Sequence, residues 1–161
     1  HMKVFNRESN VMGDASFARP LISDSGATRS INETESGSVF LFNRAAGIVY
    51  TLPTAPKVGT FFDFMVTTTV TTNAYKVITG AGTELLIGGY ISVDSDTANA
   101  MAYFSGNGST HVSVNMTPAG TNALGGIIGT KLRFTCLSST RWMVEGIVFC
   151  GGTPATAFAT S

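Results

Sequence analysis

The stretch TFFDFMVTTT, residues 60–69, carries a clear strand pattern and sets the expectation for the whole chain. Successive side chains of a strand point to opposite faces, so one face here carries Phe62, Phe64 and Val66. The other face carries Asp63 together with two further apolar side chains, Phe61 and Met65. A strand with apolar residues on both faces needs cover on both, and we therefore expect a central strand of a sheet.

Short apolar runs of the same kind occur on both sides of this stretch, separated by Gly, Pro, Asn and Ser. They are residues 39–42, 48–52, 75–79, 84–87, 90–93, 101–104, 111–116, 131–136 and 142–149. The first two are separated by a turn at Ala46-Gly47 and are predicted to form a hairpin. Their close spacing leaves no room for β-α-β units. We predict an all-β fold, a β-sandwich or jelly-roll-like barrel of about 8–10 short strands.

The composition narrows the class of protein. The chain has 161 residues, with 10 basic and 10 acidic side chains and 12% charged residues. That length predicts one domain, and a charged fraction about half the usual quarter argues against disorder and against electrostatic binding of nucleic acid. No apolar run approaches the roughly 18 residues of a membrane span. We expect neither nucleic acid nor membrane as a partner.

Charge is concentrated at the N-terminus, where the first 36 residues hold nine of the 20 charged side chains. Apolar residues there show no sustained period. We predict an extended N-terminal arm over residues 1–36 and a β-sandwich domain over residues 37–161, with His1 as a tag remnant before Met2. Such an arm packs on its own domain, crosses to a neighbouring subunit, or becomes ordered with a partner.

The two cysteines are predicted to be free thiols. If the last two predicted strands form a hairpin, Cys136 lies opposite Trp142 or Met143. Cys150 then lies about five residues further along the sheet, well beyond the reach of a disulfide. Cys136 is expected to be a small core residue.

No set of residues in the sequence assembles into a catalytic or metal site. His111 is the one histidine besides His1, and a triad needs a nucleophile and an orienting acid beside it. Asp94-Ser95-Asp96 is a close acidic pair, but the further ligands of a calcium loop are missing from the residues that follow. We therefore expect no catalytic residue, no metal site and no cofactor, and we predict that the protein is not an enzyme.

Five short motifs follow one another between residues 31 and 156. They are ESGSVF (35–40), Ala46-Gly47 before Leu52-Pro53, KVGTFFDF (57–64), IGG (87–89) and SSTRWMVEG (138–146). In this order they resemble a family of tailed-bacteriophage head decoration proteins, also called cement proteins. The resemblance spans about three quarters of the chain.

The resemblance implies a small β-sandwich or barrel, a homotrimer, that binds the major capsid protein on the outside of the virion after synthesis in the bacterial cytoplasm. The function implied is non-enzymatic stabilisation of the capsid. A charged arm suits contact with capsid surface groups. The candidate contact residues are Lys3, Arg7, Arg19 and Arg29.

A second hypothesis about the function remains open, because serine-glycine and leucine-proline β modules are also found in phage tail fibres. The chain would then be a receptor- or carbohydrate-binding module that stacks sugars on exposed aromatic rings. The candidate stacking residues are Tyr90, Tyr103 and Trp142.

Overall fold

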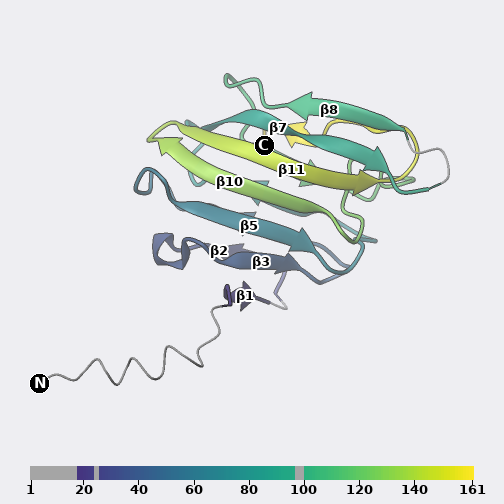
Figure 1. Ribbon diagram of the computed structural model, residues 1–161, viewed down its shortest axis with the longest axis horizontal. Helices are drawn as coiled ribbons and strands as arrows, with labels where there is room; N and C mark the ends of the chain where they lie inside the picture. The colour runs from purple at the N-terminus through teal and green to yellow at the C-terminus, as the bar shows by residue number, and fades with distance from the viewer. Residues whose placement is uncertain (1–17, 24–25, 97–99) are drawn as a thin grey trace, which may run out of the picture.

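The computed structural model describes residues 18–23, 26–96 and 100–161, which form two β-sheets packed face to face (Figure 1). The seven-stranded sheet has the order β1 (Leu21–Ile22), β3 (Val39–Phe42), β5 (Phe61–Val66), β10 (Lys131–Ser138), β11 (Arg141–Cys150), β7 (Leu85–Asp94) and β8 (Met101–Ser105). The five-stranded sheet has the order β12 (Phe158–Ala159), β9 (Ser113–Met116), β6 (Tyr75–Ile78), β4 (Ile48–Thr51) and β2 (Thr28–Ser30). A 3-10 turn, η1, covers Glu33–Glu35. The predicted all-β sandwich is confirmed.

The predicted hairpin of residues 39–42 and 48–52 is wrong. β3 pairs in parallel with β5, and β4 pairs in parallel with β6 in the opposite sheet. The chain passes from one sheet to the other at Gly47, whose φ of 98° favours glycine. Both strands bury aromatic side chains, and Phe40 meets Tyr50 across the core with ring centroids 5.4 Å apart. The two runs therefore face each other between the sheets rather than pairing edge to edge.

Most other strand predictions hold, with one merger. The segments 84–87 and 90–93 form a single strand, β7, because Gly88 and Gly89 continue it without a break. A side chain at Gly89 would lie 2.1 Å from the Phe104 carbonyl oxygen, so the neighbouring strand requires glycine there. Three strands of two or three residues, β1, β2 and β12, were not predicted, because so short a run shows no alternation.

The hairpin of β10 and β11 confirms the analysis of the cysteines. Cys136 lies opposite Trp142, and both Cys136 and Cys150 are free and buried. Burial is the main cause that raises the pKa of the Cys136 thiol above its ordinary value. The thiol is thus an unreactive core group at neutral pH.

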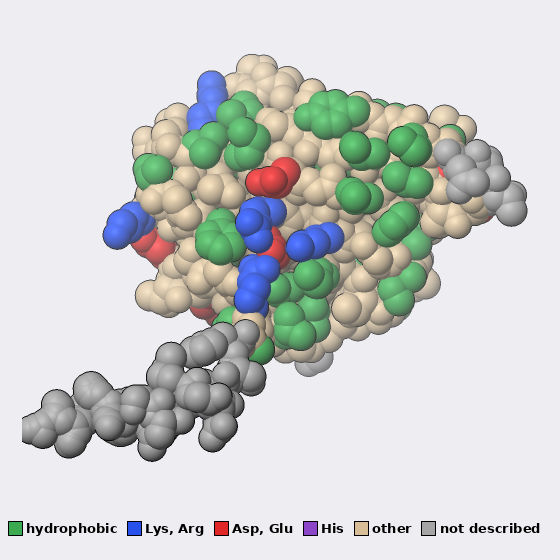
Figure 2. Space-filling view, viewed as in Figure 1, with side chains coloured by type: hydrophobic (Ala, Val, Ile, Leu, Met, Phe, Trp, Pro, Cys, Tyr) green, Lys and Arg blue, Asp and Glu red, His purple; other side chains and the backbone are tan. Residues whose placement is uncertain are grey.

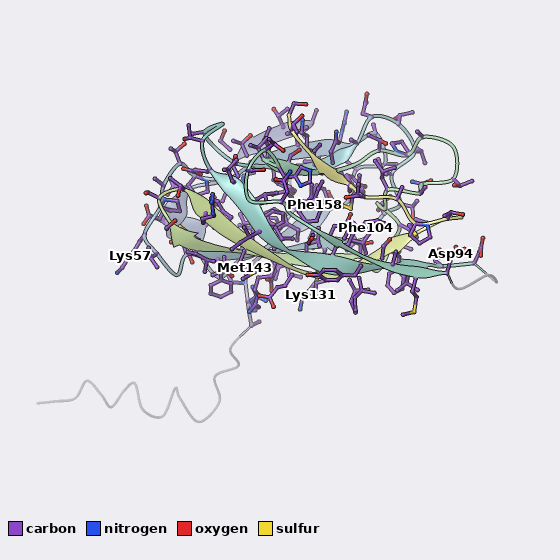
Figure 3. All side chains as sticks on the ribbon, turned by 90° about the horizontal axis from the view of Figure 1, so that it is seen from above. Lys57, Asp94, Phe104, Lys131, Met143 and Phe158 are labelled. Carbon is purple, nitrogen blue, oxygen red and sulfur yellow. The ribbon has the colours of Figure 1, made fainter. Side chains whose placement is uncertain are left out.

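Aromatic side chains from both sheets fill the core. Phe62 and Phe64 of β5 are 0% and 1% exposed, and β5 is central, between β3 and β10, as predicted. The other aromatic rings of the core are Phe40, Phe42, Tyr50, Tyr75, Tyr90, Phe134, Trp142 and Phe158. Seen from above, Phe104 and Phe158 lie between the layers while Lys131 lies outside the seven-stranded sheet (Figure 3). The other face of β5, which was also expected to be covered, is the outer face of the sheet, and Phe61 on it is only half-buried.

The boundary of the predicted arm at residue 36 needs correction. β1 pairs with β3, β2 pairs with β4, and Ile31 is 4% exposed within the core. Residues 18–23 and 26–36 thus pack on their own domain, which was one of the three possibilities. Residues 1–17 lie outside the described part of the chain. No helix among the described residues has the length and apolar character to cross a membrane.

Candidate functional site

The outer face of the seven-stranded sheet collects most of the exposed large apolar side chains. Of eight such side chains in the described residues, six lie here: Leu21, Ile91, Met101, Tyr103, Leu137 and Ile147. The space-filling view of this face shows several groups of hydrophobic side chains and a group of Lys, Arg, Asp and Glu side chains among them (Figure 2). Single exposed apolar residues are ordinary on protein surfaces, but a contiguous group marks an interaction site.

Asp63 forms the centre of this face. Its side chain is 0% exposed although it lies on the outer side of β5. Arg133, its cross-strand neighbour on β10, donates from Nε to Oδ1 at 2.7 Å and from Nη2 to Oδ2 at 3.0 Å. Arg19 donates from Nη1 to the same Oδ2. Two guanidinium groups therefore enclose one carboxylate, one of them in the bidentate geometry that gives strong pairs.

The ionisation of Asp63 follows from these contacts. Burial alone raises the pKa of a carboxyl group, but the hydrogen bonds and positive charges of Arg133 and Arg19 outweigh burial here. The pKa of Asp63 lies below its ordinary value, and the carboxylate is charged at neutral pH. The pKa of Arg133 is raised chiefly by its hydrogen bond to Asp63.

The guanidinium groups of both arginines lie over the Phe61 ring. The guanidinium carbons of Arg133 and Arg19 lie 4.7 Å and 5.8 Å from the ring centroid, within the range of a cation–π contact. Arg19 also donates from Nε and Nη2 to the Gly37 carbonyl oxygen, at 2.9 Å and 2.8 Å. We define Arg19, Phe61, Asp63 and Arg133 as the arginine cluster. It joins the segment before β1 to the centre of the sheet.

A shallow groove runs beside the arginine cluster along β10 and β11. It encloses about 440 Å³ and is lined by Lys131, Arg133, Glu145, Ile147 and Phe149, among others. Two cations and a carboxylate thus stand beside two apolar side chains in one depression. Such a groove suits an apolar side chain of a protein partner with a charged neighbour.

The four predicted capsid-contact residues do not lie on one surface. Lys3 and Arg7 lie outside the described residues. Arg19 belongs to the arginine cluster, with 39% of its side chain exposed. Arg29 lies on β2 of the other sheet, where it pairs with Glu35 at 2.6 Å and covers the Phe40 ring. The structure therefore places only Arg19 on the candidate face.

The sugar-stacking set needs a larger correction, because two of its three rings are buried. Tyr90 is 1% exposed and Trp142 is 0% exposed. The Tyr90 hydroxyl accepts a hydrogen bond from the Ala157 amide, and Trp142 donates from Nε1 to buried Glu84. Burial raises the pKa of Tyr90 to about 12. Only Tyr103, 62% exposed, can meet a ligand, so the three residues form no shared platform.

The acidic loop gains no ligands in the described residues. Asp94 is 1% exposed, its Oδ1 accepts from the Asp96 amide at 3.1 Å, and its Oδ2 has no hydrogen-bond partner in the structure as described. Within the ranges 18–23, 26–96 and 100–161, no three residues of the types His, Cys, Asp and Glu gather to hold a metal. His111 accepts from the Asn107 amide at Nδ1 and stacks on Phe158.

Sequence reasoning missed Arg133, Lys131 and Glu145 as members of a surface site. The available signal was Asp63, a charge within an apolar strand that had to find a partner. Finding that partner requires the register of β5 against β10, which alternation within one strand does not supply.

Comparisons with models of known protein families, with curated proteins and with solved structures found no match. The outer face of the seven-stranded sheet is therefore the candidate functional site. That face is broad, apolar at its margins and largely charge-compensated at its centre. It also exposes Arg, Tyr and Met side chains, residue types that are enriched in protein–protein interfaces.

Proposed function

We propose that this protein is a non-enzymatic structural component of a phage virion, which binds the outside of the capsid and stabilises it. The observation that carries the proposal is that six of the eight exposed large apolar side chains of the described residues lie on the same sheet face as the arginine cluster. The motif resemblance points to the same role. The partner is the major capsid protein, and the place of action is the outer surface of the virion.

A rigid sandwich suits this task for a mechanical reason. Its core is filled with aromatic rings from both sheets, so the outer face keeps its shape when a load is applied to it. Contacts of modest strength, repeated by many copies over a lattice, reinforce one another through effective concentration. A homotrimer, as the resemblance implies, multiplies the contacts of each bound unit.

The polar contacts of the proposed interface come from the groove and from the cluster. Lys131 is exposed at the groove, and a capsid carboxylate beside it would gain a charge-assisted hydrogen bond. Arg19 and Arg133 keep 39% and 40% of their side chains exposed while they hold Asp63. Lys3 and Arg7 are proposed to add contacts from the N-terminal segment, whereas Arg29 is already paired with Glu35.

The test is electron microscopy of purified expanded capsids with and without added protein. We expect additional density at regular lattice positions and saturable co-sedimentation. Lys131→Glu is expected to weaken binding about tenfold or more, through repulsion of a capsid carboxylate. Lys57→Glu makes the same charge change in a loop away from the groove and serves as the control (Figure 3). Absence of density, or equal loss in both variants, would overturn the proposal.

The contribution of the N-terminal segment is tested by substitution rather than by deletion. Removing residues 3–30 would also remove β1, β2 and the Arg19 contact, and so would damage the sandwich itself. The double variant Lys3→Glu, Arg7→Glu leaves these elements in place. Weaker capsid binding by that variant supports a contact there. Glycan binding that is lost in Tyr103→Ala would favour the carbohydrate-binding reading instead.

A further inference from the structure

We propose that two copies of this protein pair edge to edge through β8, antiparallel and with Tyr103 on the two-fold axis. The pairing would join two seven-stranded sheets into one continuous sheet. It concerns the β8 edge of the sheet, whereas the groove proposed for the capsid lies along β10 and β11. It is also a two-fold contact, additional to any three-fold contact of a trimer.

The first observation is that β8 has an open backbone edge. The sheet ends at β8, which pairs only with β7. The Gly106 amide donates to Gly88, and the Ala100 carbonyl accepts from the Asp94 amide, so the even-numbered residues face β7. By alternation, the amide and carbonyl groups of Met101, Tyr103 and Ser105 point away from β7. No described residue bonds these outward groups.

The second observation is that this edge lacks the usual protection. Natural proteins blunt free edges with short strands, lysine, proline or bulges. The other three edge strands, β1, β2 and β12, are two or three residues long. β8 has five residues, MAYFS, with no charge, no proline and a regular register against β7. Met101 and Tyr103 are 68% and 62% exposed on it, next to Ile91 at 42%.

The third observation is that the edge is complementary to itself. With Tyr103 facing the Tyr103 of a second copy, Met101 faces Ser105 on both sides of the axis, as a two-fold interface requires. Met101, Tyr103 and Ser105 are the residues whose amide and carbonyl groups point outward. Each facing pair can therefore exchange two backbone hydrogen bonds. The long Met101 side chain then stands opposite the short Ser105 side chain. No like charges meet, because the strand has none.

The expected strength follows from the size of the contact. A stable dimer buries about 1,000 Å² or more in total, and one five-residue strand with a few apolar side chains lies near the lower limit. We therefore expect a dimer that dissociates in the micromolar range. Sedimentation equilibrium on the full chain should show mass increasing with concentration over this range. A species of constant mass with no cross-link at position 103 would overturn the proposal.

Cysteine cross-linking tests the register directly, because the native Cys136 and Cys150 are buried. Facing residues of an antiparallel pair lie about 5.5 Å apart at Cα, within disulfide range. Under mild oxidation Tyr103→Cys alone should form a covalent dimer. Met101→Cys alone and Ser105→Cys alone should not, while the double variant Met101→Cys, Ser105→Cys should.

The controls distinguish a specific pair from random collision. Equal cross-linking by all three single variants, or none by Tyr103→Cys, would overturn the two-fold register. Tyr103→Lys places two like charges on the axis and should raise the dimer dissociation constant at least tenfold. The circular dichroism and urea midpoint of Tyr103→Lys should stay unchanged, since residue 103 is exposed. Lys131→Glu tests capsid binding, whereas the substitutions at residue 103 test the dimer. Failure of one proposal can therefore be told from failure of the other.

Discussion

The two faces of β5 stabilise the protein in different ways although they share six consecutive residues. On the inner face Phe62, Phe64 and Val66 are at most 2% exposed and pack among aromatic rings. On the outer face Asp63 is just as buried, but two arginines cover it rather than a second sheet. The inner face supplies most of the free energy of folding through apolar burial. The outer face determines which segments are held together, because only matched partners satisfy a buried charge.

Two phenylalanine substitutions, one on each face of β5, should show the largest difference in the free energy of unfolding. Phe64→Ala leaves a cavity among Phe40, Tyr50 and Phe134 and should lower the free energy of unfolding by about 3–5 kcal/mol. Phe61→Ala, in the same strand, loses two cation–π contacts and half-buried area, and should cost about 1 kcal/mol. Urea unfolding of both variants measures the difference. Equal losses would show that the outer face contributes as much as the core.

Asp63→Asn tests the outer face of β5 directly, because asparagine keeps the shape of the side chain and removes its charge. It leaves two guanidinium groups facing each other over an uncharged amide, and should cost about 2 kcal/mol at neutral pH. Urea unfolding near pH 7 measures this loss. Glu145→Gln, an exposed carboxylate on the same face, should cost much less and is the control.

The pH dependence of that loss has a definite sign. The pKa of Asp63 in the folded protein is below 3.8, so in acid the unfolded chain binds a proton first. Stability from Asp63 is therefore complete above about pH 4–5 and is lost as pH falls through the folded pKa. The difference between the wild-type protein and Asp63→Asn should be constant from pH 7 to pH 5 and shrink below the ordinary pKa. A difference that shrinks above pH 5 would contradict the lowered pKa.

Arg19→Ala should have the smallest effect on global stability. Arg19 is 39% exposed, and solvent screens its pair with Asp63, so a loss of about 0.5–1 kcal/mol is expected. The larger effect should be local, since Arg19 holds β1 beside β3. The Val39 amide, which donates to the Pro20 carbonyl, should exchange its hydrogen faster. Arg141→Ala, at the far end of β11, should leave that amide unchanged.

Much of the fold could be predicted because strand identity is local. Alternation located β5, β6, β10 and β11 within a few residues. Turn spacing placed Cys136 opposite Trp142 or Met143, and the structure pairs it with Trp142. Pairing was harder to predict. Residues 39–42 and 48–52 are adjacent in sequence and both apolar, which suits a hairpin and suits two facing sheets equally well. Only the aromatic contacts across the core distinguish these arrangements.

The candidate site was less accessible to prediction because it depends on which face each residue takes. Tyr90 and Trp142 were plausible sugar-stacking residues by type. Their positions along the strands place both side chains inside, where they form hydrogen bonds with Ala157 and Glu84. Arg133 carried no motif and still became the main partner of Asp63. A shift of one position along the strand moves a side chain from the surface of a sheet to its core.

The sequence by itself determined the all-β class, the low charge, the positions of most strands and the free cysteines, because these follow from alternation, composition and chain length. The tertiary structure decided the parallel winding between two sheets, the place of residues 18–23 and 26–36 within the domain, and the joining of Arg19, Asp63 and Arg133. These three outcomes depend on contacts between residues 18 to 70 positions apart, and such contacts are selected by packing and by the need to pair a buried charge.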